Sequence, residues 1–173
     1  VLTKDQANQV EAMADSVFTH DTLGPMVMDA ITNDSAEQSM FAEINGVNCK
    51  GRIDALCETP AGMCLLDLKT SSRSLAVEQL AFYLRLCTEC GQKVNRVMIG
   101  FVGSNPPYPI RVCELTPEWL EAASKVNDIR LHEWKTTDWD CPEDNDQSIA
   151  DLDMPVICEI RRCDGNDLPS SSE

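Results

Sequence analysis

Residues 63–69 constrain the fold more than any other part of the sequence. They read Met-Cys-Leu-Leu-Asp-Leu-Lys, an apolar run that reaches its charged residues only at its end. A strand that is apolar on both faces is typical of the centre of a sheet that is covered on both sides. We therefore expect a central strand here, with helices packed on both faces of its sheet.

Hydrophobic spacing and turn residues predict the other elements of the chain. Apolar positions at helical spacing predict helices over residues 4–19, 23–31, about 75–90 and 117–134. Asn45-Gly46 predicts a two-residue hairpin. Strands are expected over residues 40–44, 47–56, 63–69, 94–102 and 110–115. This order predicts a single α/β domain with a mixed central β-sheet flanked by helices.

The helices also carry signals for their ends and for their buried sides. Thr3 and Thr116 are expected to cap the first and last helices, Ser74 the third, and Gly91 to end the third. The apolar stripes predict inward-facing positions. In the first, second and last helices these include Val10, Val17, Phe18, Met26, Ala30, Ile31, Ala123, Ile129 and Leu131.

Length and composition fit one globular domain. With 173 residues, the chain is long enough for a sizeable core, and we assign residues 1–163 to it. Residues 164–173 are polar and are expected to form a disordered tail. No apolar run approaches the ~20 residues of a membrane span. The nine cysteines are odd in number, which favours reduced thiols and a cytoplasmic location.

Charge is distributed unevenly along the chain. The net charge is −15, which is unusual for a protein that binds nucleic acid. Residues 46–100, however, hold seven Lys or Arg and five Asp or Glu. This weakly basic centre can engage phosphates, although it lacks the long-range attraction of a basic protein.

Two acids and a lysine lie at the ends of neighbouring predicted strands in this centre. Asp54 and Asp67 could meet at one point, and Mg²⁺ needs only one or two protein carboxylates. Lys69 shares a strand face with Asp67 because the two are two residues apart. A lysine there could orient or deprotonate the attacking water, and the Leu68 carbonyl could be a further ligand. The arrangement predicts a metal site suited to phosphodiester hydrolysis.

Each of these signals also has a purely structural interpretation. An Asp-x-Lys tripeptide occurs often by chance, and charged strand ends are usually solvated. Gln79 and Tyr83 share a helix face, which alone indicates only a half-buried surface. A single histidine such as His20 is more often a surface or capping residue. The Cys87-x-x-Cys90 pair is better explained by free thiols than by zinc, since no second pair has matching spacing.

Together the motifs resemble a known family. Gly51-x-x-Asp54, Asp67-x-Lys69 and Gln79-x-x-x-Tyr83 occur in the order and spacing of the PD-(D/E)xK nuclease superfamily, in its RecB-like branch. The resemblance is closest to the RecE-type exonuclease VIII nuclease domain and covers roughly residues 10–160. Flanking similarities add to it: His20 after the first helix, the segments 37–41 and 49–55, Pro107-Tyr108 and Met154-Pro155.

The resemblance implies a restriction-endonuclease-like core and a Mg²⁺-dependent exonuclease, with Mn²⁺ as a substitute metal. The implied substrate is the end of double-stranded DNA, digested 5′ to 3′ in recombination or repair. The implied partners are a single-strand annealing protein and further copies of the chain in a ring. The implied roles are metal ligation by His20, Asp54, Asp67 and the Leu68 carbonyl, and catalysis by Lys69, with Gln79 and Tyr83 as the helix motif and Glu37 as an accessory acid.

The sequence departs from the family pattern at two positions. Ile53 replaces the proline that names the superfamily, and Asp67 replaces the more frequent glutamate. Two other functions remain open at this stage. One is a related structure-specific endonuclease or resolvase, and the other is a non-catalytic descendant that binds a partner through its acidic surface.

Overall fold

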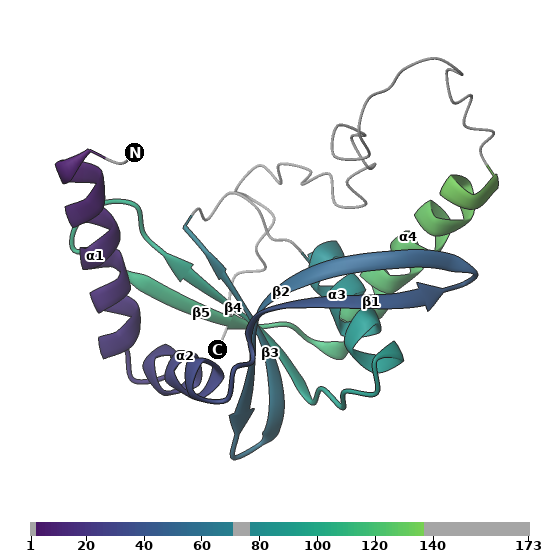
Figure 1. The fold of residues 1–173 in the computed structure, drawn as a ribbon, viewed down its shortest axis with the longest axis horizontal. Helices are drawn as coiled ribbons and strands as arrows, with labels where there is room; N and C mark the ends of the chain where they lie inside the picture. Colours follow the sequence, from purple (N-terminus) through teal and green to yellow (C-terminus); the bar gives the residue numbers. More distant parts are fainter. Residues whose placement is uncertain (1–2, 71–76, 137–173) are drawn as a thin grey trace, which may run out of the picture.

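A computed structural model describes residues 3–70 and 77–136 of the chain (Figure 1). Its elements, in chain order, are α1 (Lys4–Thr19), α2 (Leu23–Thr32), β1 (Ala36–Ile44), β2 (Val47–Thr59), β3 (Gly62–Lys69), α3 (Val77–Glu89), β4 (Arg96–Val102), β5 (Ile110–Glu114) and α4 (Pro117–Thr136). The predicted order of helices and strands is confirmed. The predicted tail, the Ser74 cap and the Met154-Pro155 segment lie outside the described residues.

The five strands form one mixed sheet in the order β1-β2-β3-β4-β5. Neighbouring strands are antiparallel except β3 and β4, which are parallel. A parallel pair needs a crossover connection, and α3 lies in it. The strand predicted to be central is β3, and Leu65 and Leu66 there are both fully buried, one in each of the two core clusters.

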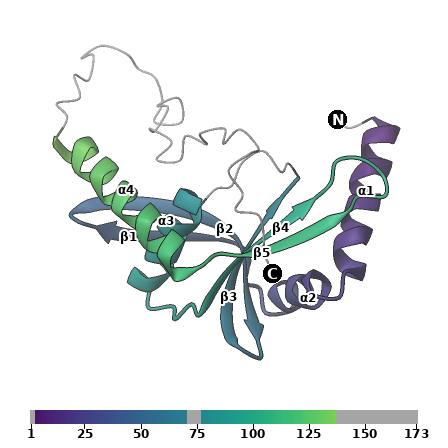
Figure 2. The ribbon, with the colours of Figure 1, turned by 180° about the vertical axis from the view of Figure 1, so that it is seen from behind.

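Helices cover both faces of the sheet. One cluster of buried residues joins the sheet to α3 and α4 through Leu80, Leu86 and Leu131. The other joins it to α1 and α2 through Val17 and Leu23. Figures 1 and 2 show the two helix pairs on opposite sides of the sheet. The α/β prediction is therefore confirmed.

Strands β1 and β2 form the hairpin that Asn45-Gly46 predicts. Ile44 pairs with Val47, and both turn residues have positive φ, 54° at Asn45 and 77° at Gly46. This is the conformation that an Asn-Gly turn adopts with little strain. In Figure 1 the hairpin extends away from the other strands, alongside α3 and α4.

Strand β2 changes its neighbour in the middle. It pairs with β1 as far as Ala55, and its pairing with β3 begins at the same residue. Ile53 belongs to the α3–α4 cluster, whereas Ala55, only two residues further, belongs to the α1–α2 cluster. The strand must therefore twist sharply between them, and Asp54 stands at this bend.

The predicted helix ends are observed where the structure describes them. Thr3 Oγ1 accepts from the Gln6 N–H at 3.2 Å, and the Gln6 side chain accepts from the Thr3 N–H at 2.9 Å, which is a capping box. Gly91 has a φ of 76° just after α3. Thr116 Oγ1 accepts from the Trp119 N–H at 3.4 Å at the start of α4.

Four side chains predicted to face inward are exposed instead: Val10 (56%), Phe18 (44%), Ile31 (52%) and Ile129 (59%). The helix α1 packs mainly on α2, so only Val17 of its stripe is buried. The buried side of α4 is set by Ala123, Asn127 and Leu131, which recur every four residues. Helical spacing alone does not show which side of a broad stripe meets the sheet.

Two further findings concern the described residues as a whole. None of their helices is long and apolar enough to cross a membrane. Their six cysteines are free thiols.

Candidate active site

Asp67 and Lys69 meet at the carboxyl end of β3. They are two residues apart, so both side chains project to the same side of the strand. The Lys69 Nζ atom lies 3.0 Å from Asp67 Oδ1 and 2.9 Å from Asp67 Oδ2. The Asp67 side chain is only 2% exposed, and that of Lys69 is 21% exposed. A nearly buried ion pair therefore closes the end of the central strand.

The Asp67 carboxylate is incompletely satisfied in this pair. Lys69 donates a hydrogen bond to Oδ1, but Oδ2 has no partner with hydrogen-bond geometry despite its short distance from Nζ. Burial raises the pKa of Asp67 to about 6; the hydrogen bond and charge of Lys69 oppose the rise, and the charge of Asp54 adds to it. A buried carboxylate oxygen without a donor fits a bound cation, which would satisfy the oxygen and lower this pKa.

Asp54 is held beside this pair by a backbone contact between two strands. Its Oδ2 accepts a hydrogen bond of 2.8 Å from the Leu68 N–H. The contact spans the point where β2 bends, so it fixes the carboxylate next to the end of β3. Among the described residues, Asp54 Oδ1 has no hydrogen bond. Each acid thus has one carboxylate oxygen without a hydrogen bond among the described residues, Asp54 Oδ1 and Asp67 Oδ2, although the latter still lies 2.9 Å from Lys69 Nζ.

Helix α3 supplies two more members of the site. Gln79 Oε1 accepts from Lys69 Nζ at 3.2 Å, and Gln79 Nε2 donates to the Tyr83 hydroxyl at 2.9 Å. Gln79 and Tyr83 lie one turn apart and face the sheet. A continuous chain of contacts therefore runs from Asp67 through Lys69 and Gln79 to Tyr83. The hydrogen bond to Tyr83 holds the Gln79 amide, and the oxygen of this amide orients the Lys69 ammonium group.

Gly51 allows α3 to approach β2 closely. A Cβ atom at this position would lie 2.6 Å from Leu86 Cδ1 and 3.0 Å from Tyr83 Cε1. The strand and the helix that carries Tyr83 are therefore in direct contact at this point. This contact explains, in physical terms, why a glycine fits three residues before Asp54.

Replacing Gly51 with alanine should displace the Leu86 and Tyr83 side chains. Overpacking of this kind costs about 1–3 kcal/mol of unfolding free energy. Chemical denaturation would measure the loss, with Asn48→Ala at an exposed position of the same strand as control. Equal unfolding midpoints for Gly51→Ala and Asn48→Ala would contradict this account of the contact.

His20 lies directly after α1 and forms a local cap. Its Nδ1 accepts from the backbone N–H groups of Thr22 at 3.2 Å and Leu23 at 3.3 Å. An Nδ1 that accepts hydrogen bonds carries no proton, so in the neutral ring the proton is on Nε2. In this arrangement Nε2 is a donor, and the cap would have to open before it could bind a metal. The metal role of His20 stays a prediction.

The neighbours of His20 pack on the face of β3 opposite to Asp67 and Lys69. Leu23, at the start of α2, contacts Gly100 of β4, and so does Leu68, which lies between Asp67 and Lys69. Within residues 3–70 and 77–136, no three His, Cys, Asp or Glu side chains form a group that could hold a metal ion.

Two predicted residues have other contacts. The Leu68 N–H donates a hydrogen bond to Asp54 Oδ2, and the Leu68 carbonyl remains a predicted metal ligand. Glu37 forms a 2.7 Å ion pair with Arg52 Nε, and the two side chains are 62% and 64% exposed. Sequence reasoning missed this pair. It could have been found by counting from the Asn45-Gly46 turn, which places Ser39 opposite Arg52 and hence Glu37 diagonally across from it.

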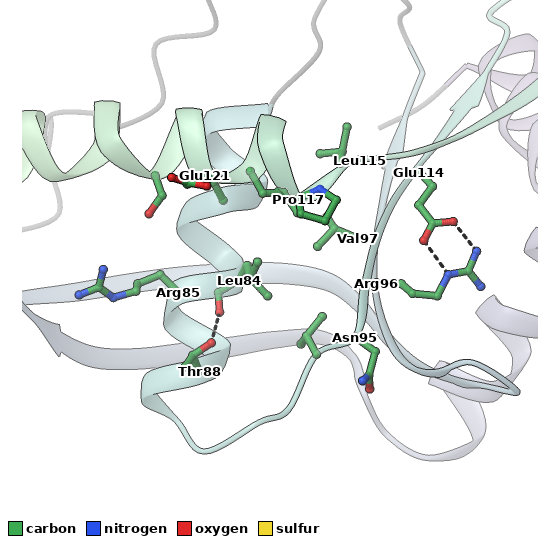
Figure 3. A pocket seen from close by; sticks show the side chains of 14 residues that line it. Leu84, Arg85, Thr88, Asn95, Arg96, Val97, Glu114, Leu115, Pro117 and Glu121 are labelled. Carbon is green, nitrogen blue, oxygen red and sulfur yellow. Dashed lines mark hydrogen bonds and ion pairs between the residues drawn. The ribbon is translucent and has the colours of Figure 1, made fainter.

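A pocket of about 510 Å³ lies elsewhere, between α3, α4 and the adjoining parts of β4 and β5. Figure 3 shows its lining, in which Arg96 and Glu114 pair with each other at 2.6 and 2.8 Å. None of Asp54, Asp67, Lys69, Gln79 and Tyr83 lines this pocket. Because its charged groups are largely paired, we place the candidate chemistry at Asp54, Asp67 and Lys69 instead.

Comparisons with known proteins bear on the fold. No family model and no curated protein sequence matches the chain. A crystal structure from Eubacterium rectale, described as "Putative exonuclease", matches with a TM-score of 0.55 and 17% identity over 76% of this chain. The match covers 55% of that protein, so this chain spans little more than half its length. A second structure, SSO0001, covers 78% of this chain and 72% of its own at 16% identity, with a TM-score of 0.33, which is too low to support an argument.

The first match shows the fold at low sequence identity. Together with the mixed five-stranded sheet and its flanking helices, it confirms the predicted α/β fold with a mixed central sheet flanked by helices.

Proposed function

We propose that this chain is a metal-dependent deoxyribonuclease whose centre is formed by Asp54, Asp67 and Lys69. The observation that carries the proposal is the Asp67 carboxylate: it is 2% exposed, its Oδ2 lacks a hydrogen bond, and a lysine lies 3 Å away. Such an arrangement is costly in a protein that only needs to fold. It is well suited to a protein that binds a divalent cation.

The two acids would hold Mg²⁺, or Mn²⁺ in its place. Mg²⁺ favours hard oxygen ligands, and one or two carboxylates are enough. When bound, such a metal lowers the pKa of a bound water and neutralises charge on a phosphodiester. The hydrogen bond from the Leu68 N–H orients Asp54, and burial keeps Asp67 in place.

Lys69 would act on the phosphate and the attacking water. Its ammonium contacts both oxygens of Asp67. A metal ion that takes these oxygens would release part of this contact and leave Gln79 as the anchor of the lysine. The ammonium could then donate to a phosphate oxygen as negative charge develops there. Tyr83 holds Gln79 in turn.

The finer proposal is a RecE-type exonuclease. Its substrate would be the end of double-stranded DNA, digested 5′ to 3′ in recombination or repair, with a single-strand annealing protein and further copies of the chain as partners. It is supported by the resemblance of the three motifs and by a structural neighbour described as "Putative exonuclease".

Digestion of linear and closed circular duplex DNA tests this proposal. The linear substrate carries a label at one 5′ end, and each reaction is run with Mg²⁺ and with EDTA. We expect Mg²⁺-dependent release of short labelled products from the linear DNA. The closed circles are expected to remain intact. Nicked or linearised circles would favour an endonuclease, and intact DNA of both kinds with either Mg²⁺ or Mn²⁺ would contradict a nuclease function.

A further inference from the structure

The β1–β2 hairpin has one buried and one exposed face. Along β2, Cys49, Gly51 and Ile53 are buried, whereas the residues between them, Lys50 and Arg52, are exposed. This alternation follows the period of two of a strand. Both cationic side chains therefore project from the side of the hairpin that faces away from the α3–α4 cluster.

An aromatic ring lies beside these cations. The strand register places Phe41 directly opposite Lys50, and Ser39 opposite Arg52. Phe41 is 65% exposed, the largest value among the exposed large hydrophobic side chains of the described residues. The Lys50 Nζ atom lies 5.4 Å from the centre of its ring. We call Phe41, Lys50 and Arg52 the hairpin face.

The hairpin face shares a strand with one residue of the candidate active site, Asp54. Asp54 continues the alternating series of Lys50 and Arg52 on the same strand. At about 3.3 Å per residue, Lys50 and Asp54 are separated by roughly 13 Å along β2. A strand of nucleic acid lying on this row could therefore reach the acidic centre within a few nucleotides.

We propose that the hairpin face binds the single-stranded DNA that enters or leaves the candidate active site. This inference rests on the proposed nuclease function and names a substrate contact for it. A base stacks on Phe41, Lys50 binds a neighbouring phosphate, and Arg52 exchanges its exposed ion pair with Glu37 for the next phosphate towards Asp54. Positive side chains with an exposed aromatic ring beside them are the combination that binds single strands without sequence preference.

Two features favour a single strand over a duplex. The faces of paired bases within a duplex are covered by their neighbours, so successive bases can stack on the exposed ring of Phe41 only when they are unpaired. The hairpin face is also flanked by Glu37 and Glu43, both exposed on β1. They leave too little net positive charge to attract the dense phosphates of a duplex, whose binding is dominated by charge.

Fluorescence anisotropy in EDTA tests the proposal on the full 173-residue chain. The probe is a 5′-labelled oligo(dT) of about 12 nucleotides, a length within reach of a single-strand site. We expect Phe41→Ala to weaken binding about tenfold, since one stacked base is lost. Lys50→Ala should weaken binding at low salt and reduce the slope of log K against log salt by about 0.7.

Matched substitutions on exposed sites elsewhere serve as controls. Phe18→Ala removes another exposed phenylalanine, 44% exposed on α1. Lys125→Ala removes an exposed lysine on α4, whose side chain is 72% exposed. Both should leave binding of oligo(dT) unchanged, and circular dichroism should show that all four variants are folded.

The outcomes separate this inference from the proposed function. If the wild type fails to cleave DNA but Phe41→Ala and Lys50→Ala weaken binding, the hairpin face is supported and the nuclease function is not. If the wild type cleaves DNA and these variants bind oligo(dT) as tightly as the wild type, the hairpin face is refuted. A loss confined to duplex DNA, or a change only in oligomeric state, would also overturn it.

Discussion

Replacing Asp67 with asparagine is expected to abolish cleavage of duplex DNA and, in the metal-free protein, to raise stability above pH 6. Asparagine keeps the shape of the side chain but loses the negative charge that binds the metal. We expect the rate to fall by more than about a thousandfold, in line with the loss of a principal electrostatic contact at a reacting centre. Cleavage of linear duplex in Mg²⁺ measures it.

The gain in stability follows from the raised pKa of Asp67. Its pKa is about 6 in the folded chain and near 3.9 when unfolded, so the folded state binds the proton more tightly. Stability from this group is therefore fully present below about pH 4, falls as the pH rises, and is lost above about pH 6. The cost at pH 8 is on the order of 3 kcal/mol, part of which the asparagine variant avoids.

Thermal melts in EDTA at pH 4, 6 and 8 test the predicted gain in stability. The difference in Tm between Asp67→Asn and wild type should be largest at pH 8 and smallest at pH 4. Glu58→Ala, which removes an exposed acid on β2, should show neither the loss of activity nor the pH-dependent gain. A variant that is destabilised equally at all three pH values would show that Asp67 is a structural residue.

Replacing Lys69 with alanine is the second substitution with a large expected effect. We expect cleavage to fall by about 10²–10⁴-fold, the range for a lost acid–base or charge-stabilising group. The variant should also require a higher pH for its remaining activity. The reason for this shift is Asp67. The charge and hydrogen bond of Lys69 oppose the rise in the pKa of Asp67, and because both disappear in the variant, that pKa should rise further.

The pH profile separates a catalytic from a structural role for Lys69. A purely structural loss would lower activity equally at all pH values, whereas this account predicts a displaced profile. Lys125→Ala serves as the control for removal of an exposed lysine. Activity close to that of the wild type in Lys69→Ala would refute the proposed role.

Much of the fold can be predicted from local patterns in the sequence. Asn45-Gly46 sets the hairpin and, with it, the register of β1 and β2. The apolar run of β3 identifies the central strand, and Thr3 and Gly91 mark helix ends. These features depend on a few adjacent residues, so they can be predicted without knowledge of the tertiary structure. The packing of Val10 and Ile129 depends on distant partners, and there the prediction was wrong.

In the candidate site, too, local features could be predicted and features that depend on distant residues could not. Asp67 and Lys69 share a strand face by spacing alone, and their contact is observed. The bend of β2 at Asp54 could not be predicted, because it arises from the exchange of one neighbouring strand for another. The cap formed by His20 and the ion pair of Glu37 are likewise results of tertiary geometry. They determine which atoms remain available for binding.

Calorimetric titration of Mn²⁺ into the metal-free chain at pH 8 tests the central claim most directly. The account predicts saturable binding by the wild type and its loss in Asp67→Asn, with Glu58→Ala binding as the wild type does. Absence of binding to the wild type, or equal binding by wild type and Asp67→Asn, would contradict a metal centre at Asp54 and Asp67.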